Sequence, residues 1–448
     1  MESPASPDAK LQPWWWEKAP PPRLPTVALA ERYDVAVVGS GFTGLRAALE
    51  LARAGRSVVV LDRDDPGNGA ARRNAGYLGR TLKKSFAKLR KTRGEPYALA
   101  IYRELGEAYR GTQRFIAEEG IDCHLVACGR FIAASRPAHY EELARDLEVM
   151  RRHLDYPFEM VPRDEQRREF ASDAYHGGAL IPDLASLHPG LYHQGLLDRA
   201  LAAGVTVAGR TLGNSVAPHA GEDRVELLTN GGRIRARDAI IATNGYTPGH
   251  LDWHARRVIP FMAYMAATEE LGAARVAELI PQNRTVLDSF TNIDFFRRAP
   301  DSPRLLVGGA TGSGMTSIEL ITQRLRGILL RVLPQLDGVR LSHVWTGYCA
   351  GTFDLMPHVG GQDGIWHGLG YNFAGVPMGT HFGKVIADAI LGRAAAPSAF
   401  AQDAFPSFPF YRGRPWFVPL AMRWFDWRED RKSTRLNSSH GHISHAAF

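Results

Sequence analysis

Cysteine is nearly absent from this chain of 448 residues, which contains only Cys123, Cys128 and Cys349. So low and odd a number argues against a disulfide framework. The pair Cys123 and Cys128 also lacks a second pair with which it could bind zinc. We therefore expect neither disulfide bonds nor a metal site.

Long apolar runs are missing as well, since none reaches the length needed to cross a bilayer. The start of the chain is rich in proline and carries acidic residues, unlike a secretory signal. These absences predict a cytoplasmic protein without a membrane span. The formal net charge of +7 is modest for this length and does not by itself indicate a nucleic-acid partner.

The most informative stretch that is present runs from Asp34 to Asp62 and reads DVAVVGSGFTGLRAALELARAGRSVVVLD. An apolar strand leads into a GxGxxG turn, an amphipathic helix follows, and a second strand ends at an acidic residue. Because all these parts occur in register, the stretch predicts a βαβ unit that binds a dinucleotide. The unit alone does not distinguish FAD from NAD.

Each glycine of the turn has its own expected role. Gly39 allows the tight turn, Gly41 lets the backbone approach a pyrophosphate, and Gly44 lets helix and strand pack closely. The N-terminus of the helix then offers free N–H groups and a positive dipole end to the phosphates. Asp62, at the end of the second strand, is placed to accept hydrogen bonds from an adenosine ribose.

The middle of the chain alternates between two kinds of pattern. Alternating strands and helices over residues 33–82, 176–250 and 342–400 suit the dinucleotide-binding domain. Residues 83–175 and 251–341 combine β-like runs with covering helices and suit a substrate domain. The sequence therefore predicts two domains whose segments interleave along the chain.

Both ends of the chain are expected to lie outside these domains. Residues 1–32 are rich in proline and carry Trp14-Trp15-Trp16, which predicts an extended arm whose tryptophans pack on the body. Residues 401–429 are expected to wrap over the surface as a C-terminal segment. Residues 430–448 begin with DRKSTRLNSSH, which resembles a translated sequencing adapter, so we interpret them as a non-native tail.

Together the fragments resemble the FAD-dependent amine and amino-acid oxidoreductases of the D-amino-acid oxidase superfamily. Within it, the chain is most similar to the branch with glycine/sarcosine oxidases and gamma-glutamylputrescine oxidase. The resemblance implies an α/β fold in which a Rossmann-like FAD-binding domain is interleaved with an α+β substrate domain built on a mixed or antiparallel sheet. It rests on DVAVVGSGFTGLRAALELA, GAARRNAG, LHPGLY, AIIATNGYTP, DFFRR, WTGYCAGTFDLMPHVG and GYNFAGVPMGTHFG.

The resemblance also implies FAD in an extended pose. Arg63 and the backbone of Leu212 would approach the adenine, and Arg73 and Asn74 would lie beside the phosphates and the flavin. Because Cys349 is not where some relatives attach FAD, non-covalent binding is expected. The implied cofactor contacts are Gly39, Gly41, Phe42, Thr43, Gly44, Asp62, Arg63, Ala70, Arg73, Asn74, Gly76, Leu212, Asn244, Gly347, Asp354, Asn372, Phe373, Ala374, Gly375 and Val376.

The implied reaction removes a hydride from the carbon next to a neutral amine nitrogen and delivers it to flavin N5. The resulting imine is hydrolysed, and oxygen or another electron acceptor takes up the electrons. The expected substrate is a secondary amine, an amino acid such as glycine or sarcosine, or a gamma-glutamylated polyamine. This route needs no separate catalytic base.

Three residues are candidates for substrate contact. Arg297 could bind a carboxylate through both guanidinium nitrogens, with a surface ion pair to Asp294 or Asp301 as the alternative. Tyr264 is a candidate wall of the pocket, although an aromatic strand residue also suits a core. Phe373, in the late turn, is the third candidate.

Two alternatives to an oxidase stay open. Leu306 stands where sarcosine oxidases carry a lysine that promotes reaction with oxygen, which allows a dehydrogenase of D-amino acids with another acceptor. Arg72 and Phe373 replace smaller residues of the family pattern near the flavin, which allows a catalytically inactive FAD-binding subunit.

Overall fold

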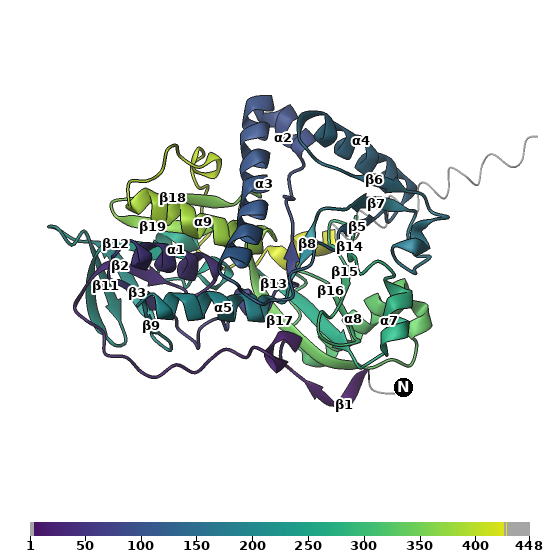
Figure 1. Ribbon diagram of the computed structural model, residues 1–448, viewed down its shortest axis with the longest axis horizontal. Coiled ribbons are helices and arrows are strands. Elements are labelled where there is room, and N and C mark those ends of the chain that lie inside the picture. Colours follow the sequence, from purple (N-terminus) through teal and green to yellow (C-terminus); the bar gives the residue numbers. More distant parts are fainter. Residues whose placement is uncertain (1–3, 425–426, 428–448) are drawn as a thin grey trace, which may run out of the picture.

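An eight-stranded sheet forms around the predicted βαβ unit. In this computed structural model, which describes residues 4–424 and Trp427, β2 (Arg32–Val38) and β3 (Val58–Leu61) pair in parallel and α1 (Phe42–Arg53) joins them. The strand order is β10-β11-β12-β2-β3-β9, and β19 pairs with both β12 and β18 (Figure 1). The other strands are β9 (Thr206–Ala208), β10 (Gly213–Pro218), β11 (Val225–Thr229), β12 (Gly232–Ile241), β18 (His358–Gln362) and β19 (Ile365–Leu369).

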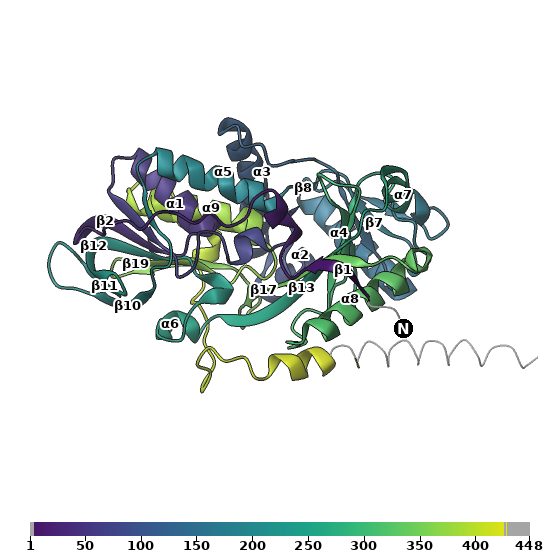
Figure 2. The same cartoon turned by 90° about the horizontal axis from the view of Figure 1, so that it is seen from below.

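Helices cover one face of this sheet. Helix α1 packs between α5 (Pro189–Ala202) and α9 (Gly375–Ile390), and the three lie together above the strands in Figure 2. All four side chains of β3, VVVL, are buried, as expected for a parallel strand that is covered on both faces. The Rossmann-like part of the predicted fold is confirmed.

A nine-stranded sheet forms the second half of the molecule, in the order β1-β17-β13-β16-β15-β14-β5-β7-β6. Most neighbours are antiparallel, whereas β1 with β17 and β5 with β14 are parallel, so the predicted mixed sheet is confirmed. Helix α8 (Ile318–Val332) packs on β13, β16 and β17. The strands are β1 (Ala5–Lys10), β5 (Arg130–Ala133), β6 (Glu159–Val161), β7 (Gly178–Ile181), β13 (Ile259–Thr268), β14 (Thr285–Asp288), β15 (Phe295–Arg298), β16 (Leu305–Gly309) and β17 (Leu341–Gly351).

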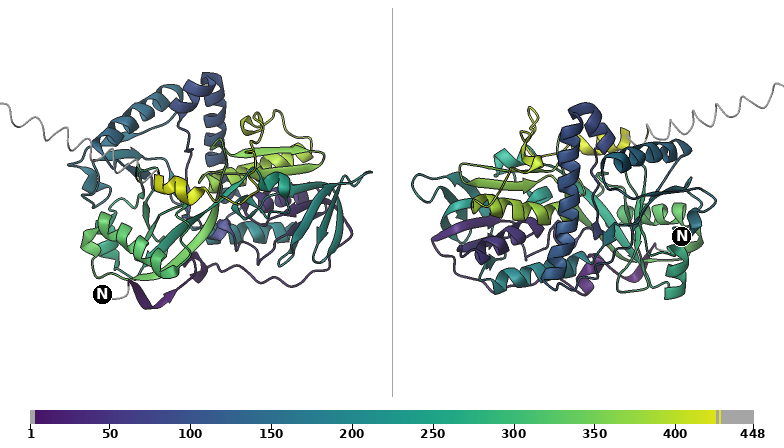
Figure 3. Two further views of the ribbon diagram at one scale, coloured as in Figure 1. Left: turned by 180° about the vertical axis from the view of Figure 1, so that it is seen from behind. Right: turned by 45° about the horizontal axis from the view of Figure 1, so that its top comes forward.

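A long helix, α3 (Glu95–Glu118), lies between the two halves and packs on α9 and α2 (Figure 3). A short ladder, β4 (Tyr77–Leu78) with β8 (Ala185–Ser186), follows the loop that leaves the first sheet. The remaining elements are α2 (Phe86–Arg93), α4 (Pro137–His153), α6 (Asp252–Ala255), α7 (Ala273–Leu279), η1 (Trp14–Glu17), η2 (Ala70–Arg72), η3 (Gln166–Arg168), η4 (Asn244–Tyr246), η5 (Pro334–Leu336) and η6 (Ala399–Ala401).

Two strands belong to a different half of the molecule from the one that the sequence predicts. β7 and β17 lie in the ranges 176–250 and 342–400, which we assigned to the dinucleotide-binding domain, yet both pair within the nine-stranded sheet. β17 pairs with β13 from Leu341 to Gly351. Because this strand begins in one half and ends beside the other, a boundary drawn along the sequence does not follow the packing.

The N-terminal arm packs on the body, as expected. Trp15 is fully buried and its Nε1 donates to the carbonyl oxygen of Asn74 at 2.8 Å. Trp14 Nε1 donates to Asp301 at 3.1 Å. The arm also contributes β1 to the nine-stranded sheet, a pairing that its proline-rich composition did not predict.

The C-terminal segment wraps over both halves within the described residues. Arg257 Nε donates to the carbonyl of Phe405 at 3.0 Å, and the hydroxyl of Tyr411 donates to that of Val258 at 2.8 Å. A helical turn after Pro415 then runs below the second half (Figure 2). The predicted non-native tail, residues 430–448, lies outside the described residues.

Within residues 4–424 and 427, none of the helices has both the length and the apolar character needed to span a bilayer. The same part of the chain holds no group of His, Cys, Asp or Glu side chains arranged to bind a metal ion.

Candidate active site

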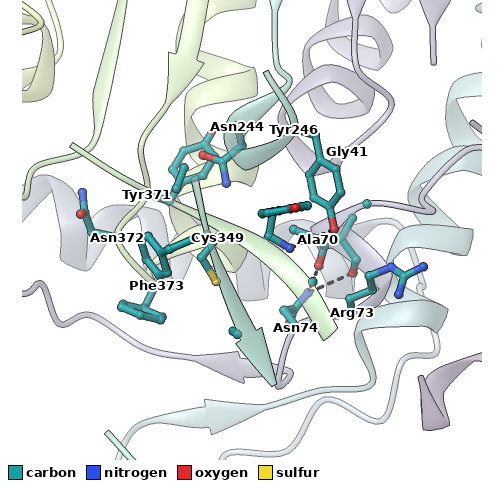
Figure 4. A pocket seen from close by; sticks show the side chains of 18 of the residues that line it. Gly41, Ala70, Arg73, Asn74, Asn244, Tyr246, Cys349, Tyr371, Asn372 and Phe373 are labelled. Atoms are coloured by element: carbon teal, nitrogen blue, oxygen red, sulfur yellow. Dashed lines mark hydrogen bonds between the residues drawn. The ribbon is translucent and has the colours of Figure 1, made fainter. Parts of the chain in front are cut away.

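A cavity of 580 Å³ lies where the two sheets meet, within the range of roughly 300–1,000 Å³ that is typical of ligand sites. Its wall runs from the GxGxxG turn, past η2 and the start of α9, to the paired strands β13 and β17 of the other sheet (Figure 4). Residues from both halves of the molecule therefore border one continuous space.

The GxGxxG turn has the geometry that the sequence predicts. Gly39 has φ +107°, and a Cβ there would lie 2.7 Å from the carbonyl oxygen of Ala242. A Cβ on Gly44 would overlap the carbonyl oxygen of Gly39, whereas one on Gly41 would meet nothing within 4 Å. Gly41 caps α1 without a side-chain hydrogen bond, so the first N–H groups of the helix remain for an anion.

Asp62 follows β3 and lines the cavity. Its Oδ2 accepts hydrogen bonds from Ser40 N at 3.0 Å and Ser40 Oγ at 2.5 Å, and its Oδ1 accepts one from Asp64 N at 3.1 Å. Burial raises the pKa of Asp62, and the hydrogen bonds from Ser40 oppose this rise. The carboxylate thus joins β3 to the glycine turn at the predicted ribose position.

Arg73 places a positive charge in the cavity wall. Its Nε donates to Asn68 O at 2.7 Å, its Nη1 to Thr346 O at 3.0 Å and its Nη2 to Asn68 Oδ1 at 3.1 Å, so all three hydrogen-bond acceptors are neutral. Burial lowers the pKa of Arg73. A half-buried cation with neutral partners suits a nearby pyrophosphate, because the anion would offset the cost of burying the charge.

Asn74 shapes the same loop. Its Nδ2 donates to the carbonyls of Ala70 and Ala71, both at 3.0 Å (Figure 4), and its Oδ1 accepts from Gly76 N at 2.8 Å. These bonds hold η2 against the cavity.

The turn before α9 contains two non-glycine residues in the left-handed region, Asn372 with φ +46° and Phe373 with φ +77°. Asn372 Nδ2 donates to Gly370 O at 2.6 Å and to Thr352 Oγ1 at 3.2 Å, which fixes the turn. The start of α9, from Ala374 to Val376, lines the cavity, so the positive end of this helix faces it. The N-cap residue, Ala374, has no side chain that could bond to the first N–H groups of the helix. Half of the Phe373 side chain is exposed, and its ring centroid lies 5.5 Å from that of Phe261.

Most of the predicted cofactor residues border this space. Leu212 is among them, although its backbone N–H donates to Asn230 Oδ1 at 2.9 Å and its carbonyl accepts from Asn230 N at 3.3 Å. The bordering residues are Gly39, Gly41, Phe42, Thr43, Asp62, Arg63, Ala70, Arg73, Asn74, Leu212, Asn244, Gly347, Asn372, Phe373, Ala374, Gly375 and Val376.

Three predicted cofactor residues are not part of the cavity wall. Gly44 packs α1 against the strand behind it. Gly76 has φ +70°, and a Cβ there would lie 2.5 Å from Arg297 Nη1. The carboxylate of Asp354 accepts a hydrogen bond from His358 Nε2 at 3.0 Å and one from Met356 N at 3.1 Å, so it shapes a turn behind the wall.

Arg297 and Tyr264, two of the three predicted substrate contacts, do not line the cavity. Arg297 is buried, and its Nη1 donates to the carbonyls of Ala75, Gly76 and Leu187 at 2.9 to 3.1 Å. Burial lowers the pKa of this guanidinium, which ties loops together instead of facing a ligand.

We expected Tyr264 to line the pocket, but its side chain lies on the opposite face of β13. Successive side chains of β13 point to opposite faces, and Ile259, Phe261, Ala263 and Met265 face the cavity. Tyr264 therefore packs in the core beneath α8, where its hydroxyl donates to Met315 O at 2.9 Å.

Several residues of the wall escaped the sequence analysis. Phe261 could have been found from the alternation of β13, and Tyr246 from the motif AIIATNGYTP. Arg130 gave no local signal. The C-terminal segment adds Phe417, Val418 and Met422.

Arg72, which suggested an inactive subunit, turns away from the cavity. Its Nε donates to His193 Nδ1 at 2.9 Å, and its Nη1 donates to the carbonyls of Ala19 and Pro20 at 2.9 and 2.8 Å. Burial lowers the pKa of Arg72 to about 10. The side chain therefore fixes the N-terminal arm and leaves the cavity open.

Two further residues near the cavity bear on the sequence interpretation. Leu306 does not line it and is buried with Trp15, Met265 and Trp345. Cys349 does line it, and burial raises the pKa of its thiol to about 12. This thiol is therefore protonated at neutral pH.

The chain matches a known protein family and a characterised relative over most of its length. The sequence profile of the family described as FAD dependent oxidoreductase matches residues 34–389. Gamma-glutamylputrescine oxidoreductase of Escherichia coli (strain K12) is 31% identical over 395 residues, which cover 86% of this chain and 90% of the relative.

Solved structures share the fold. Glycine oxidase from Geobacillus kaustophilus superposes with a TM-score of 0.70 at 21% identity, covering 84% of this chain and 99% of that one. Iminodiacetate oxidase from Chelativorans sp. BNC1 superposes with a TM-score of 0.65 at 19% identity, covering 82% and 98%.

Proposed function

Because the chain belongs to the family of FAD dependent oxidoreductases, we propose that it oxidises the C–N bond of an amine or amino acid to an imine, which water then hydrolyses. When bound, FAD supplies the acceptor for a hydride from the carbon next to the nitrogen. The protein's task is to hold the cofactor, orient the C–H bond and keep bulk water away.

One observation carries the proposal: a single cavity joins the GxGxxG turn of the first half to β13 and β17 of the second. In the proposed arrangement the ribose contacts Asp62, and the uncapped start of α1 holds the pyrophosphate. The turn from Asn372 to Val376 would border the flavin ring, and the positive end of α9 would favour negative charge on that ring.

The space beyond the turn is proposed to hold the substrate. Its wall is largely apolar and includes Phe261, Phe295 and Phe373, which would exclude water from the reacting bond. Among the described residues, the wall contains neither a histidine nor a glutamate, and its two aspartates, Asp62 and Asp64, lie beside the glycine turn. This composition suits removal of a hydride from a neutral amine, a route without a protein base.

The relatives support an amine nitrogen as the reacting group, because two of them are gamma-glutamylputrescine oxidoreductase and glycine oxidase. The proposed substrates are therefore a secondary amine, an amino acid such as glycine or sarcosine, or a gamma-glutamylated polyamine. Oxygen is the proposed electron acceptor, and FAD is proposed to bind without a covalent link.

The test is an anaerobic screen in which FAD-loaded protein is mixed with glycine, sarcosine, D-alanine and gamma-glutamylputrescine. The proposal predicts that at least one of these amines bleaches the flavin absorbance, while N-methylacetamide, whose nitrogen is an amide, does not. Protein that keeps its FAD and stays oxidised with every amine would instead be an FAD-holding subunit.

Readmission of air then separates the acceptors. An oxidase regains its colour rapidly and produces hydrogen peroxide in proportion to the substrate consumed. Slow recovery in air together with rapid reduction of an artificial dye would replace the oxidase by a dehydrogenase.

A further inference from the structure

A buried guanidinium stands in the part of the cavity wall that the nine-stranded sheet provides. Arg130, the first residue of β5, lines the cavity and has only 4% of its surface exposed. Its Cζ lies 5.0 Å from the ring centroid of Tyr77, and that ring meets the ring of Phe295 edge-on at 5.9 Å. We call the wall formed by Tyr77, Gly79, Arg130, Leu287 and Phe295 the Arg130 end.

The charge of Arg130 is not matched within the described part of the chain. Its Nε donates to Thr285 Oγ1 at 3.2 Å, while its Nη2 is buried without a hydrogen-bond partner. Burial lowers the pKa of Arg130. Burial also raises the pKa of Tyr77 and Tyr156, so these neighbouring hydroxyls are neutral at pH 7. A buried cation among neutral groups is unfavourable unless an anion joins it.

One carboxylate acts on Tyr156 together with Arg80 and Arg130: that of Asp183, whose side chain is partly exposed. Its Oδ2 forms the ion pair with Arg80, and its Oδ1 makes no hydrogen bond to another described residue. The Cζ of Arg80 lies 4.4 Å from the ring centroid of Tyr156. Arg130 is therefore left to meet an anion from the cavity.

The other cations of the wall lie elsewhere. Arg63 pairs with Asp64 at 3.1 Å beside Asp62, and Arg73 is held by carbonyl and amide oxygens next to η2. Lys83 is an exposed side chain at the rim, with its Nζ 5.0 Å from the ring centroid of Phe373. Arg130 is thus distinguished by being both buried and unmatched at the substrate end.

We propose that Arg130 binds a carboxylate of the substrate, so that the oxidised amine is an amino acid or carries an acid group. A planar guanidinium can donate two parallel hydrogen bonds to a carboxylate, which fixes orientation as well as position. The assignment rests on the proposed function, because it presupposes an amine substrate in this cavity. Tyr77 lies three residues after Asn74, so the chain itself joins the Arg130 end to the cofactor loop.

Gly79 keeps the approach to this guanidinium open. A Cβ on Gly79 would lie 2.7 Å from Arg130 Nη1 and 3.1 Å from Nη2. Gly79→Ala would therefore crowd the guanidinium while leaving its charge in place. It is a second, independent way to disturb the site.

The experiment titrates FAD-loaded protein with acetate and, separately, with its neutral amide acetamide at constant ionic strength. Binding is followed by the shift in flavin absorbance and by the melting temperature. In Arg130→Gln the acetate affinity is expected to fall by about 10- to 100-fold, the loss of a hydrogen bond to a charged group. Arg130→Lys restores part of it, Gly79→Ala weakens it in the same direction, and acetamide binding does not change.

Lys83→Gln is the matched control, since it removes a charge from the rim and is expected to leave acetate affinity within about twofold. The proposal is overturned if Lys83→Gln weakens acetate and Arg130→Gln does not. It is also overturned if acetate and acetamide bind equally to the unaltered protein. If Arg130→Gln does not fold or does not retain FAD, the acetate affinity of Gly79→Ala is compared with that of the unaltered protein. Equal affinities then overturn the proposal.

Turnover gives a second readout. With sarcosine, Arg130→Gln raises KM and leaves kcat at saturation largely intact, whereas KM for N-methylethanolamine, which lacks the carboxylate, stays unchanged. Acetate binding requires no turnover, so the two proposals fail separately. Acetate bound through Arg130 in a protein that no amine reduces would refute only the proposed function, and reduction by amines with no acetate preference would refute only the Arg130 assignment.

Discussion

The two ends of the cavity are built in different ways. The cofactor end uses backbone N–H groups, glycines and helix starts from short continuous loops, residues 39–44, 62–64, 70–74 and 372–376. The Arg130 end uses side chains from strands that are far apart in the sequence, such as Tyr77, Arg130 and Phe295.

This difference predicts which substitutions disturb each end. At the cofactor end a Cβ added at Gly39 or Gly44 has no room, whereas exchanges between similar side chains leave the backbone contacts in place. At the Arg130 end the side chains themselves make the contacts, so substitutions there change which ligand fits. The four predictions below follow this contrast, from the largest expected effect to the smallest.

Gly44→Val is expected to abolish retention of FAD. A Cβ at this position would overlap the carbonyl oxygen of Gly39, and overpacking of this kind costs 1–3 kcal/mol, or up to roughly 100-fold in affinity. The ratio of flavin to protein after purification measures the effect. Gly249→Ala, whose Cβ would meet nothing within 4 Å, is the control and should keep a full complement. Equal retention in both variants would show that close packing of the turn is not required.

Arg297→Gln is expected to lower stability without changing ligand preference. It removes hydrogen bonds to the buried carbonyls of Ala75, Gly76 and Leu187, a loss of about 3 kcal/mol. Urea unfolding measures the change. Arg151→Gln, at an exposed residue, is the surface control and should unfold at the same urea concentration as the unaltered protein. If the variant is as stable as the unaltered protein and its KM for carboxylated amines is strongly raised, Arg297 contacts the substrate after all.

Acid is expected to weaken the half of the molecule that holds the cofactor. Burial lowers the pKa of His367 to about 3 and that of His254 to about 4, and both rings pack against each other beside β19. A histidine whose folded pKa lies below its unfolded value stabilises the fold above the unfolded pKa, near 6.5, and this contribution is lost as the pH falls towards the folded pKa. Each should cost about 2 kcal/mol between pH 7 and pH 5.

The measurement is urea unfolding of the unaltered protein and of His254→Gln at both pH values. The variant should lose less stability on acidification, because glutamine does not take up a proton in the unfolded state. An equal loss in both proteins would mean that His254 is not held neutral by the fold.

Phe373→Gly is expected to have the smallest effect, a gain in stability of about 0.5–1 kcal/mol. Glycine accepts φ +77° without strain, whereas Phe373→Ala keeps a Cβ and serves as the matched control. Both variants lose the ring that faces Phe261, so KM should rise equally in the two. If the alanine variant melts as high as the glycine variant, the turn is not strained by its Cβ.

The cofactor end could be predicted because its determinants are local. The register of strand, glycines, helix and acid predicted the roles of Gly39 and Gly44 from one stretch of sequence, and α1 joins the two parallel strands as expected. Backbone geometry follows from residues that are neighbours in the chain.

The part of the wall that the nine-stranded sheet provides could not be predicted, because its determinants depend on strand pairing. One step of alternation separates Tyr264 in the core from Phe261 in the cavity. Arg297 and Arg130 both begin as arginines on strands, and only the packing of distant loops gives one of them carbonyl partners and leaves the other unmatched. Sequence patterns identify the strands but not which charges are left without partners.

The most direct test of the whole account is the flavin absorbance of the FAD-loaded protein mixed anaerobically with sarcosine. The account predicts that the unaltered protein bleaches. It also predicts that Arg130→Gln bleaches only at about 10- to 100-fold higher sarcosine concentrations. An oxidised spectrum that no carboxylated amine changes, in protein that retains its FAD, would contradict the account.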